Sequence, residues 1–346
     1  SHAVTRAVLR GALVGFGGVA EHGHLPGFLC DPRFQICAVV DPEPAARERA
    51  ARASSGGVGL YSGLAECLGS ERLDFVDIAT PPSEHLEGIE RATGAGLHVL
   101  VEKPLARSVE EALRIERAAR RGEVALTVVH NWHHAPVFRA AREALERGAI
   151  GAPHEVEFVT ERTEPAGGGA RSWRLDGKIA GGGILVDHGW HQLYLARALL
   201  GGRDPRSVQA TTERRRWTEY SVEDTARVRV GYQGGARAVL RLTWAAPRRR
   251  TRVTIRGDSG ILRVEDGNVV VATHGRPERP WPSERDAPDD SYHASWFPGV
   301  LDAFASAVRE PTSATANQRE ALLCQAVIAA AYRSAESDGA EVAIEV

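Results

Sequence analysis

Two short stretches of this sequence carry side chains that can exchange a proton with a hydroxyl group. One is Glu102-Lys103-Pro104, and the other runs from Gly181 to His191 and contains Asp187. An imidazole with a pKa near neutrality can take up a proton and return it, and a compact ammonium can lie between a hydroxyl and a base. The two stretches therefore carry residue types that suit acid–base chemistry.

Lysine is rare in this chain. Of the 43 cationic residues only Lys103 and Lys178 are lysines, and all the others are arginines. A guanidinium is larger than an ammonium and permanently charged, so arginine would not serve between a hydroxyl and a base. A lysine at position 103 of such a chain favours a chemical role over that of an ordinary surface residue.

The second stretch has the sequence GGGILVDHGWH. Its glycines allow the backbone to approach a ligand closely and a helix to begin. Asp187 and His191 are four residues apart, so we expect them on one helical face, turned toward one cleft. A dipole-stabilised Asp187 and a packing histidine at 191 are the alternative interpretation.

A glycine-rich turn near the start predicts a dinucleotide site. Gly15-Phe16-Gly17-Gly18-Val19-Ala20 has the GxGxxA pattern, with Gly15 for the tight turn, Gly17 for the approach of a pyrophosphate and Ala20 for close helix packing. Asp41 ends the next strand, where its carboxylate could bind both ribose hydroxyls and repel a 2′-phosphate. NAD is therefore favoured over NADP, although nearby Arg47 keeps NADP open.

A third loop follows the strand that ends in DFVDIAT. Pro81 and Pro82 stop this strand after Thr80 and hold the loop extended, and His85 enters the next helix. The carboxyl ends of parallel strands face the ligand crevice, so we expect this loop to meet the cofactor.

The elements around these stretches predict an α/β fold with two domains. Short apolar runs alternate with helical patterns in the first third, which is typical of βαβ units and a parallel sheet. After Pro153, strand-like runs separated by glycine turns predict an open, mostly antiparallel sheet. We place the domains at residues 1–130 and 131–346.

Composition limits the classes of partner. The net charge is −2, so no global field favours nucleic acid or an anionic membrane, and the triple-arginine runs at 214–216 and 248–250 are interpreted as solvated loop edges. The four cysteines form no CxxC pair, which predicts free thiols and a cytoplasmic protein. No apolar run reaches membrane-spanning length.

Four segments together resemble the Gfo/Idh/MocA family of nicotinamide-dependent oxidoreductases: GFGGVAEHGHLPGF, VVDPEP, ATPPSEHLEGIERATGAGLHVLVEKPLA and GGGILVDHGWHQL. The resemblance implies an N-terminal Rossmann domain and a C-terminal α/β domain with a large open, mostly antiparallel sheet. Its outer face would make the interface of a homodimer or homotetramer. The implied activity is hydride transfer between NAD and a carbinol carbon of a sugar, inositol or sugar derivative.

The resemblance also assigns roles to residues. Lys103 would polarise the reacting oxygen, His191 would be the general base and Asp187 would orient the substrate hydroxyl or the imidazole. A cis Lys103-Pro104 bond is implied as well. The expected cofactor-binding residues are Gly15, Phe16, Gly17, Gly18, Val19, Ala20, Asp41, Thr80, Pro81, His85, Glu102, Lys103 and Asn131, and the expected substrate-binding residues are His133, Trp173, Arg174, Asp187 and His191.

The histidines of HNWHH, residues 130–134, raise the alternative of a metal site. No carboxylate or thiolate completes a ligand spacing and the family works without a metal, so Asn131 and His133 are expected to contact the cofactor amide or the substrate. Arg174 could bind a carboxylate or phosphate, or form a structural ion pair. Two other functions stay open, namely redox-neutral chemistry with a retained NAD and a non-catalytic NAD-binding sensor.

Overall fold

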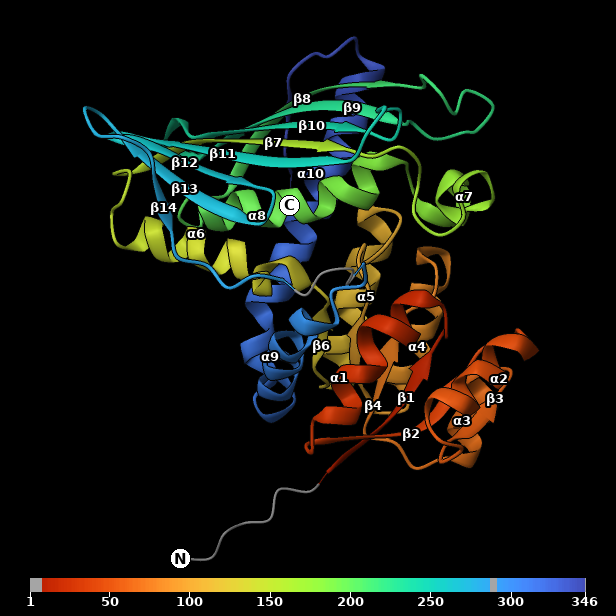
Figure 1. Ribbon diagram of the computed structural model, residues 1–346. Coiled ribbons are helices and arrows are strands. Elements are labelled where there is room, and N and C mark those ends of the chain that lie inside the picture. The colour runs from red at the N-terminus through yellow and green to blue at the C-terminus, as the bar shows by residue number, and fades with distance from the viewer. Residues whose placement is uncertain (1–7, 287–290, 346) are drawn as a thin grey trace, which may run out of the picture. The chain divides into compact units, whose positions relative to one another are not determined.

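A computed structural model describes residues 8–286 and 291–345, and its ribbon is drawn in Figure 1. Within them the chain forms two compact units. The first contains residues 8–106, 110–131 and 291–319, and the second contains residues 107–109, 132–286 and 320–345. The sequence prediction divided the chain once, after residue 130; in the structure residues 291–319 lie with the first unit.

The first unit is built on a six-stranded sheet in the order β3-β2-β1-β4-β5-β6. All its strand pairs are parallel, and this order is that of the Rossmann fold. The strands are β1 (Leu9–Val14), β2 (Phe34–Val40), β3 (Gly59–Tyr61), β4 (Phe75–Ile78), β5 (His98–Val101) and β6 (Leu126–Val128). The predicted parallel sheet is confirmed.

Helices connect these strands, and a later helix completes the core of the unit. The connecting helices are α1 (Leu25–Cys30), α2 (Pro44–Ala53), α3 (Leu64–Ser70), α4 (His85–Gly94) and α5 (Val109–Gly122). Helix α9 (Phe297–Arg309) adds aromatic side chains: Phe304 lies 5.5 Å from Phe75 of β4, ring centroid to ring centroid, and Phe75 lies 5.6 Å from Phe28 of α1. The sheet strands that carry the glycine turn and Asp77 are therefore fixed partly by residues from late in the sequence.

The second unit is built on a nine-stranded sheet in the order β14-β13-β12-β11-β7-β10-β9-β8-β15. Only β7 and β10 pair in parallel among the described strands of this sheet, so the predicted mostly antiparallel sheet is confirmed. Its strands are β7 (Pro153–Glu161), β8 (Pro205–Glu213), β9 (Thr225–Tyr232), β10 (Arg237–Thr243), β11 (Arg250–Gly257), β12 (Gly260–Glu265), β13 (Asn268–Thr273), β14 (Arg279–Trp281) and β15 (Val342–Ala343).

The two faces of the large sheet differ in chemistry. Helices α6 (Pro136–Glu146), α8 (Trp190–Leu199) and α10 (Thr315–Glu336) lie along one face, as Figure 1 shows, and α7 (Gly177–Ala180) lies in a loop region at the end of the sheet. The strands alternate buried apolar residues toward the helices with arginines and glutamates on the other face. On that outer face Glu155 pairs with both Arg237 and Arg256.

Two further findings concern the whole of the described chain. No helix among residues 8–286 and 291–345 is long and apolar enough to cross a membrane. All four cysteines have free thiols, and only Cys30 is exposed.

Candidate active site

The glycine turn has the shape that a dinucleotide needs. Gly15 has a φ of +86°, and a Cβ there would come within 3.0 Å of the Ala79 backbone, so other residues would be strained at this position. A Cβ on Gly17 would meet nothing within 4 Å, which leaves its face open to a ligand. Phe16 is fully buried, so it can offer a cofactor only its backbone. Val19–His24 continue the turn as a π-helical segment that leads into α1. Ala20 belongs to this segment and is fully buried, as expected for close helix packing.

Asp41 is fixed beside this turn at the end of β2. Its Oδ2 accepts a hydrogen bond from the Phe16 N–H at 2.8 Å, and its Oδ1 accepts one from the Glu43 N–H at 2.9 Å. Arg47 donates from Nη1 to the carbonyl oxygens of Asp41 and Pro42, at 2.6 and 2.9 Å, so its guanidinium is engaged with the backbone. A carboxylate at this position fits a ribose with free hydroxyls.

The loop after β4 holds an unsatisfied polar atom. Within the described residues, the hydroxyl oxygen of Thr80 is buried and has no hydrogen-bond partner, which fits a bound group that completes its bonding. His85 is fully buried, with Nε2 at 2.9 Å from the Thr80 carbonyl oxygen and Nδ1 at 3.3 Å from that of Leu105. Burial lowers the pKa of His85, and its ring lies between carbonyl oxygens of the Thr80-Pro81 loop and of the loop after Lys103.

The loop after β5 carries Glu102 and Lys103, and the Lys103-Pro104 bond is cis, as the family resemblance implied. Glu102 accepts a hydrogen bond at Oε2 from the Lys103 N–H at 3.0 Å. Its Oε1 lies 3.0 Å from Nε2 of His24, whose Nδ1 lies 2.7 Å from Oδ2 of Asp77. Sequence reasoning did not select His24 and Asp77. Their signals were slight: a histidine four residues after the GxGxxA turn and one acid inside an apolar strand.

In the second unit, Asp187 lies next to Arg174. Arg174 donates from Nε to Oδ1 of Asp187 at 3.3 Å, and its guanidinium lies over the Trp173 ring at 4.4 Å. His188 Nε2 is 3.7 Å from Oδ2 of the same carboxylate. Three of the predicted substrate residues, Trp173, Arg174 and Asp187, are thus brought together, and His188 joins them although it was not selected.

His191 is 8% exposed and is held by two neighbours. Its Nδ1 lies 2.8 Å from the hydroxyl oxygen of Tyr194, and its ring stacks on Trp132 with 5.1 Å between centroids. The Tyr194 hydroxyl also accepts a hydrogen bond from the Trp132 N–H at 3.1 Å. Tyr194 is a site residue that sequence reasoning missed, and its only signal was its position three residues after His191.

The helix that carries Asp187 and His191 is not regular at its start. Leu185–Gly189 form a π-helical segment before α8, whereas the sequence predicted an ordinary helical turn between the two residues. Short π-helical segments are frequent at functional sites, and a second one, Val19–His24, follows the glycine turn.

A buried carboxylate explains the glycines before this helix. Glu223 accepts hydrogen bonds from the N–H groups of Gly183 and Leu185 and from the Tyr332 hydroxyl. A Cβ on Gly183 would lie 1.9 Å from the Glu223 carbonyl oxygen, and one on Gly182 would lie 2.1 Å from the Tyr332 hydroxyl. These two glycines are needed for packing against protein, rather than for the approach of a ligand that the sequence suggested.

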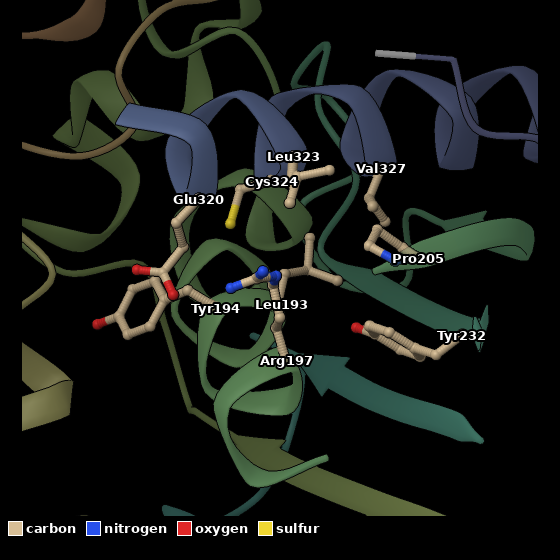
Figure 2. Close-up of a pocket in the computed structure, with 9 residues that line it drawn as sticks. All are labelled: Leu193, Tyr194, Arg197, Pro205, Tyr232, Glu320, Leu323, Cys324 and Val327. Carbon is tan, nitrogen blue, oxygen red and sulfur yellow. The ribbon is translucent and has the colours of Figure 1, made fainter. Parts of the chain in front are cut away.

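Asn131 and His133 start a 3₁₀ turn, Asn131–His134, and belong to different units. His133 Nε2 lies 3.0 Å from Oε2 of Glu320, and the His133 ring lies 4.6 Å from the Tyr194 ring. Figure 2 shows that Tyr194 and Glu320 also line a pocket between α8 and α10, together with Arg197, Tyr232 and Cys324. His133 is thus linked to the surroundings of His191 through Tyr194.

Models of two known domains match this chain. A model of an oxidoreductase family with an NAD-binding Rossmann fold matches residues 9–130, and a model of the GFO/IDH/MocA C-terminal domain matches residues 138–263. The D-apiose dehydrogenase of Paraburkholderia graminis is 30% identical over 94% of this chain and 87% of its own length. The D-glucoside 3-dehydrogenase of Escherichia coli is 26% identical over 97% of each chain.

Solved structures give the same result. The crystal structure of GenD2 from gentamicin A biosynthesis, in complex with NAD, superposes with a TM-score of 0.84 at 29% identity. It covers all of this chain, which in turn covers 98% of that one.

Proposed function

This chain belongs to the GFO/IDH/MocA family of NAD-binding oxidoreductases, and we propose that it oxidises or reduces one carbinol carbon of a cyclic sugar or sugar derivative. When bound, NAD would accept the hydride in the oxidative direction, and NADH would donate it in the reductive direction. The observation that carries the proposal is the hydrogen-bonded imidazole of His191, which shares its helix with Asp187.

His191 is the general base of the proposed reaction. When its Nδ1–H donates to the Tyr194 oxygen, the lone pair of Nε2 is left to accept the proton of a substrate hydroxyl. The Tyr194 oxygen then accepts from both the imidazole and the Trp132 N–H. In the reductive direction the same ring returns the proton.

Lys103 and Asp187 assist this transfer. The Lys103 ammonium stabilises negative charge that develops on the substrate oxygen as its proton leaves. The Asp187 carboxylate, oriented by Arg174, accepts a hydrogen bond from a substrate hydroxyl and so fixes which carbon faces the cofactor. Asp187 and Arg174 together offer an acceptor and donors at 3.3 Å from each other, a combination that suits vicinal hydroxyls.

We propose sugars as substrates because of the names of proteins related to this chain. Two relatives are named as dehydrogenases of D-apiose and of D-glucosides. Trp173 adds an aromatic ring beside Arg174, and rings of this kind pack against the apolar faces of small molecules.

The cofactor is proposed to be NAD rather than NADP. The residue held next to the glycine turn at the end of β2 is the Asp41 carboxylate, which would repel a 2′-phosphate. Arg47, which kept NADP open in the sequence, already donates to two backbone carbonyls.

The proposed assembly is a homodimer or homotetramer that uses the outer face of the nine-stranded sheet. Arginines and glutamates alternate there, and Glu157 is paired with Arg241 at 3.4 Å. A face that carries both signs can pair with a second copy of itself. Sedimentation of the purified protein at rising salt concentration tests this, since a monomer at every concentration would contradict it.

The proposed reaction is tested by following NADH absorbance with purified protein, NAD and a panel of aldoses, glycosides, inositols and sugar acids. We expect NADH to form with one or a few cyclic sugars, and the reverse reaction to consume NADH with the corresponding ketone or lactone. Tight NAD binding without reduction by any panel member would contradict the proposal.

A further inference from the structure

Asp77, His24 and Glu102 form a row of three ionisable side chains in the first unit, and Asp77 and His24 are buried. His24 is 2% exposed, and its two ring nitrogens lie 2.7 Å from an Asp77 oxygen and 3.0 Å from a Glu102 oxygen. A neutral imidazole has one N–H donor, whereas an imidazolium has two and can donate to both carboxylates at once. The geometry is therefore that of a buried cation between two anions.

The surroundings of His24 favour the charged ring. Burial by itself lowers the pKa of His24, but the attraction and hydrogen bonds of Asp77 and Glu102 outweigh it and raise the pKa to about 10. Hydrogen bonding to His24 lowers the pKa of Glu102 despite its burial, and the charge of Lys103 acts in the same direction. A third neighbour, Phe297 of α9, is uncharged and stacks on the imidazole with 4.3 Å between ring centroids.

This row connects two parts of the cofactor half. His24 ends the π-helical segment that follows the glycine turn, and Asp77 lies in β4. The Glu102 oxygen that does not contact His24 accepts the backbone N–H of Lys103 at 3.0 Å. Glu102 therefore joins the buried charges to the backbone of Lys103.

We propose that His24 and Asp77 are positioning residues for Lys103. The imidazolium keeps Glu102 ionised and in place, and Glu102 fixes the backbone from which the Lys103 ammonium reaches the substrate. The imidazolium keeps its proton throughout, so it neither donates to nor accepts from the substrate. This inference rests on the role of Lys103 in the proposed function.

Asp77→Asn is the sharpest variant, because it is isosteric, touches His24 and lies outside the Lys103 loop. With one counter-charge gone, the ring loses its proton nearer neutrality and Glu102 loses its cation. We expect kcat to fall about 10-fold, as for a lost hydrogen bond to a charged group, and the basic limb of the pH–rate profile to move. NAD affinity should change by less than about 3-fold, because no residue of the glycine turn is altered.

Phe297→Leu is the matched control, since it removes the uncharged neighbour of the same ring. It should lower the melting temperature and leave the pH–rate profile of kcat unchanged. If Asp77→Asn also lowers only the melting temperature, the row is merely structural and the inference is overturned.

A measurement on the unaltered protein keeps the test independent of any variant. Nitrogen NMR of the histidine rings at about pH 8.5 should show both nitrogens of His24 protonated, while histidines near their ordinary pKa are neutral. A neutral His24 at that pH overturns the inference even if a sugar substrate has been found. Failure to find a substrate would instead count against the proposed function. The NMR measurement would still show whether the His24 ring is charged.

Discussion

The Nδ1 atom of His191 lies 2.8 Å from the hydroxyl oxygen of Tyr194, and the same oxygen accepts the N–H of Trp132. Both side chains are buried, with Tyr194 fully so. The direction of this hydrogen bond decides which ring nitrogen carries the proton and therefore which one can accept a proton from a substrate. Tyr194 therefore affects the proposed base His191 through this hydrogen bond, although it need not touch the substrate.

Replacing Tyr194 with phenylalanine removes this hydroxyl and keeps the ring. We expect kcat to fall about 10-fold and the acidic limb of its pH profile to shift, because the imidazole loses the partner that fixes its tautomer. Tyr332→Phe is a suitable control, since it removes another buried hydroxyl, the one bonded to Glu223. Both variants should lose stability, but a pH profile altered equally in both would contradict a specific role for Tyr194.

Gly17→Ala should separate cofactor binding from folding. A Cβ at Gly17 would meet no protein atom within 4 Å, so the fold should tolerate it, but a methyl group there would obstruct a pyrophosphate. We expect the NAD dissociation constant from calorimetry to rise at least about 10-fold with an unchanged melting temperature. Gly69→Ala, equally free of neighbours but in α3, is the control and should leave NAD affinity as it is. Unchanged NAD affinity of Gly17→Ala would place the pyrophosphate elsewhere.

Asp41→Asn should relax the choice between the two nicotinamide cofactors. The amide oxygen can still accept the Phe16 N–H, but the charge that repels a 2′-phosphate is gone. We expect NAD affinity to fall about 10-fold and NADP affinity to fall less or to rise. Glu43→Gln, which changes an exposed side chain two residues further on, serves as the control. An unaltered NAD to NADP preference in Asp41→Asn would count against the ribose assignment.

The raised pKa of His24 implies that the folded protein loses stability at alkaline pH. Its pKa in the folded protein is about 10, above the value of about 6.5 in an unfolded chain. The unfolded state therefore releases the proton first, so the stabilisation is complete below about pH 6.5 and is lost as the pH rises toward 10. Urea midpoints at about pH 7 and 9.5 should differ more for the unaltered protein than for His24→Gln. Equal differences would mean that His24 titrates near its ordinary pKa.

Much of the fold could be predicted from sequence because its signals are local. The GxGxxA turn, the apolar runs of β1, β2 and β4, and the alternating strands after Pro153 each depend on a few neighbouring residues. Strand β3 has no such signal, because Gly59–Tyr61 is too short to show a pattern. The polar run of β8, with Gln209 and two threonines, resembles a loop. That residues 291–319 return to the first unit is a tertiary fact with no local signal.

The site divides in the same way. Lys103, Asp187 and His191 could be selected because their residue types are unusual in their own stretches. The cis Lys103-Pro104 bond came from the family resemblance and is confirmed. His24 and Glu223 could not be selected, because their importance depends on partners 78 and 40 residues away that only folding brings close. Tyr194 was missed although it lies only three residues after His191.

The central claim is that Lys103 takes part in a hydride transfer between NAD and a sugar. The chain offers a matched pair for testing it, because Lys103 and Lys178 are its only lysines. With the substrate that gives most NADH, we expect Lys103→Ala to lower kcat at least about 100-fold while NAD still binds. We expect the kcat of Lys178→Ala to equal that of the unaltered protein. Equal kcat values for the two variants would contradict it.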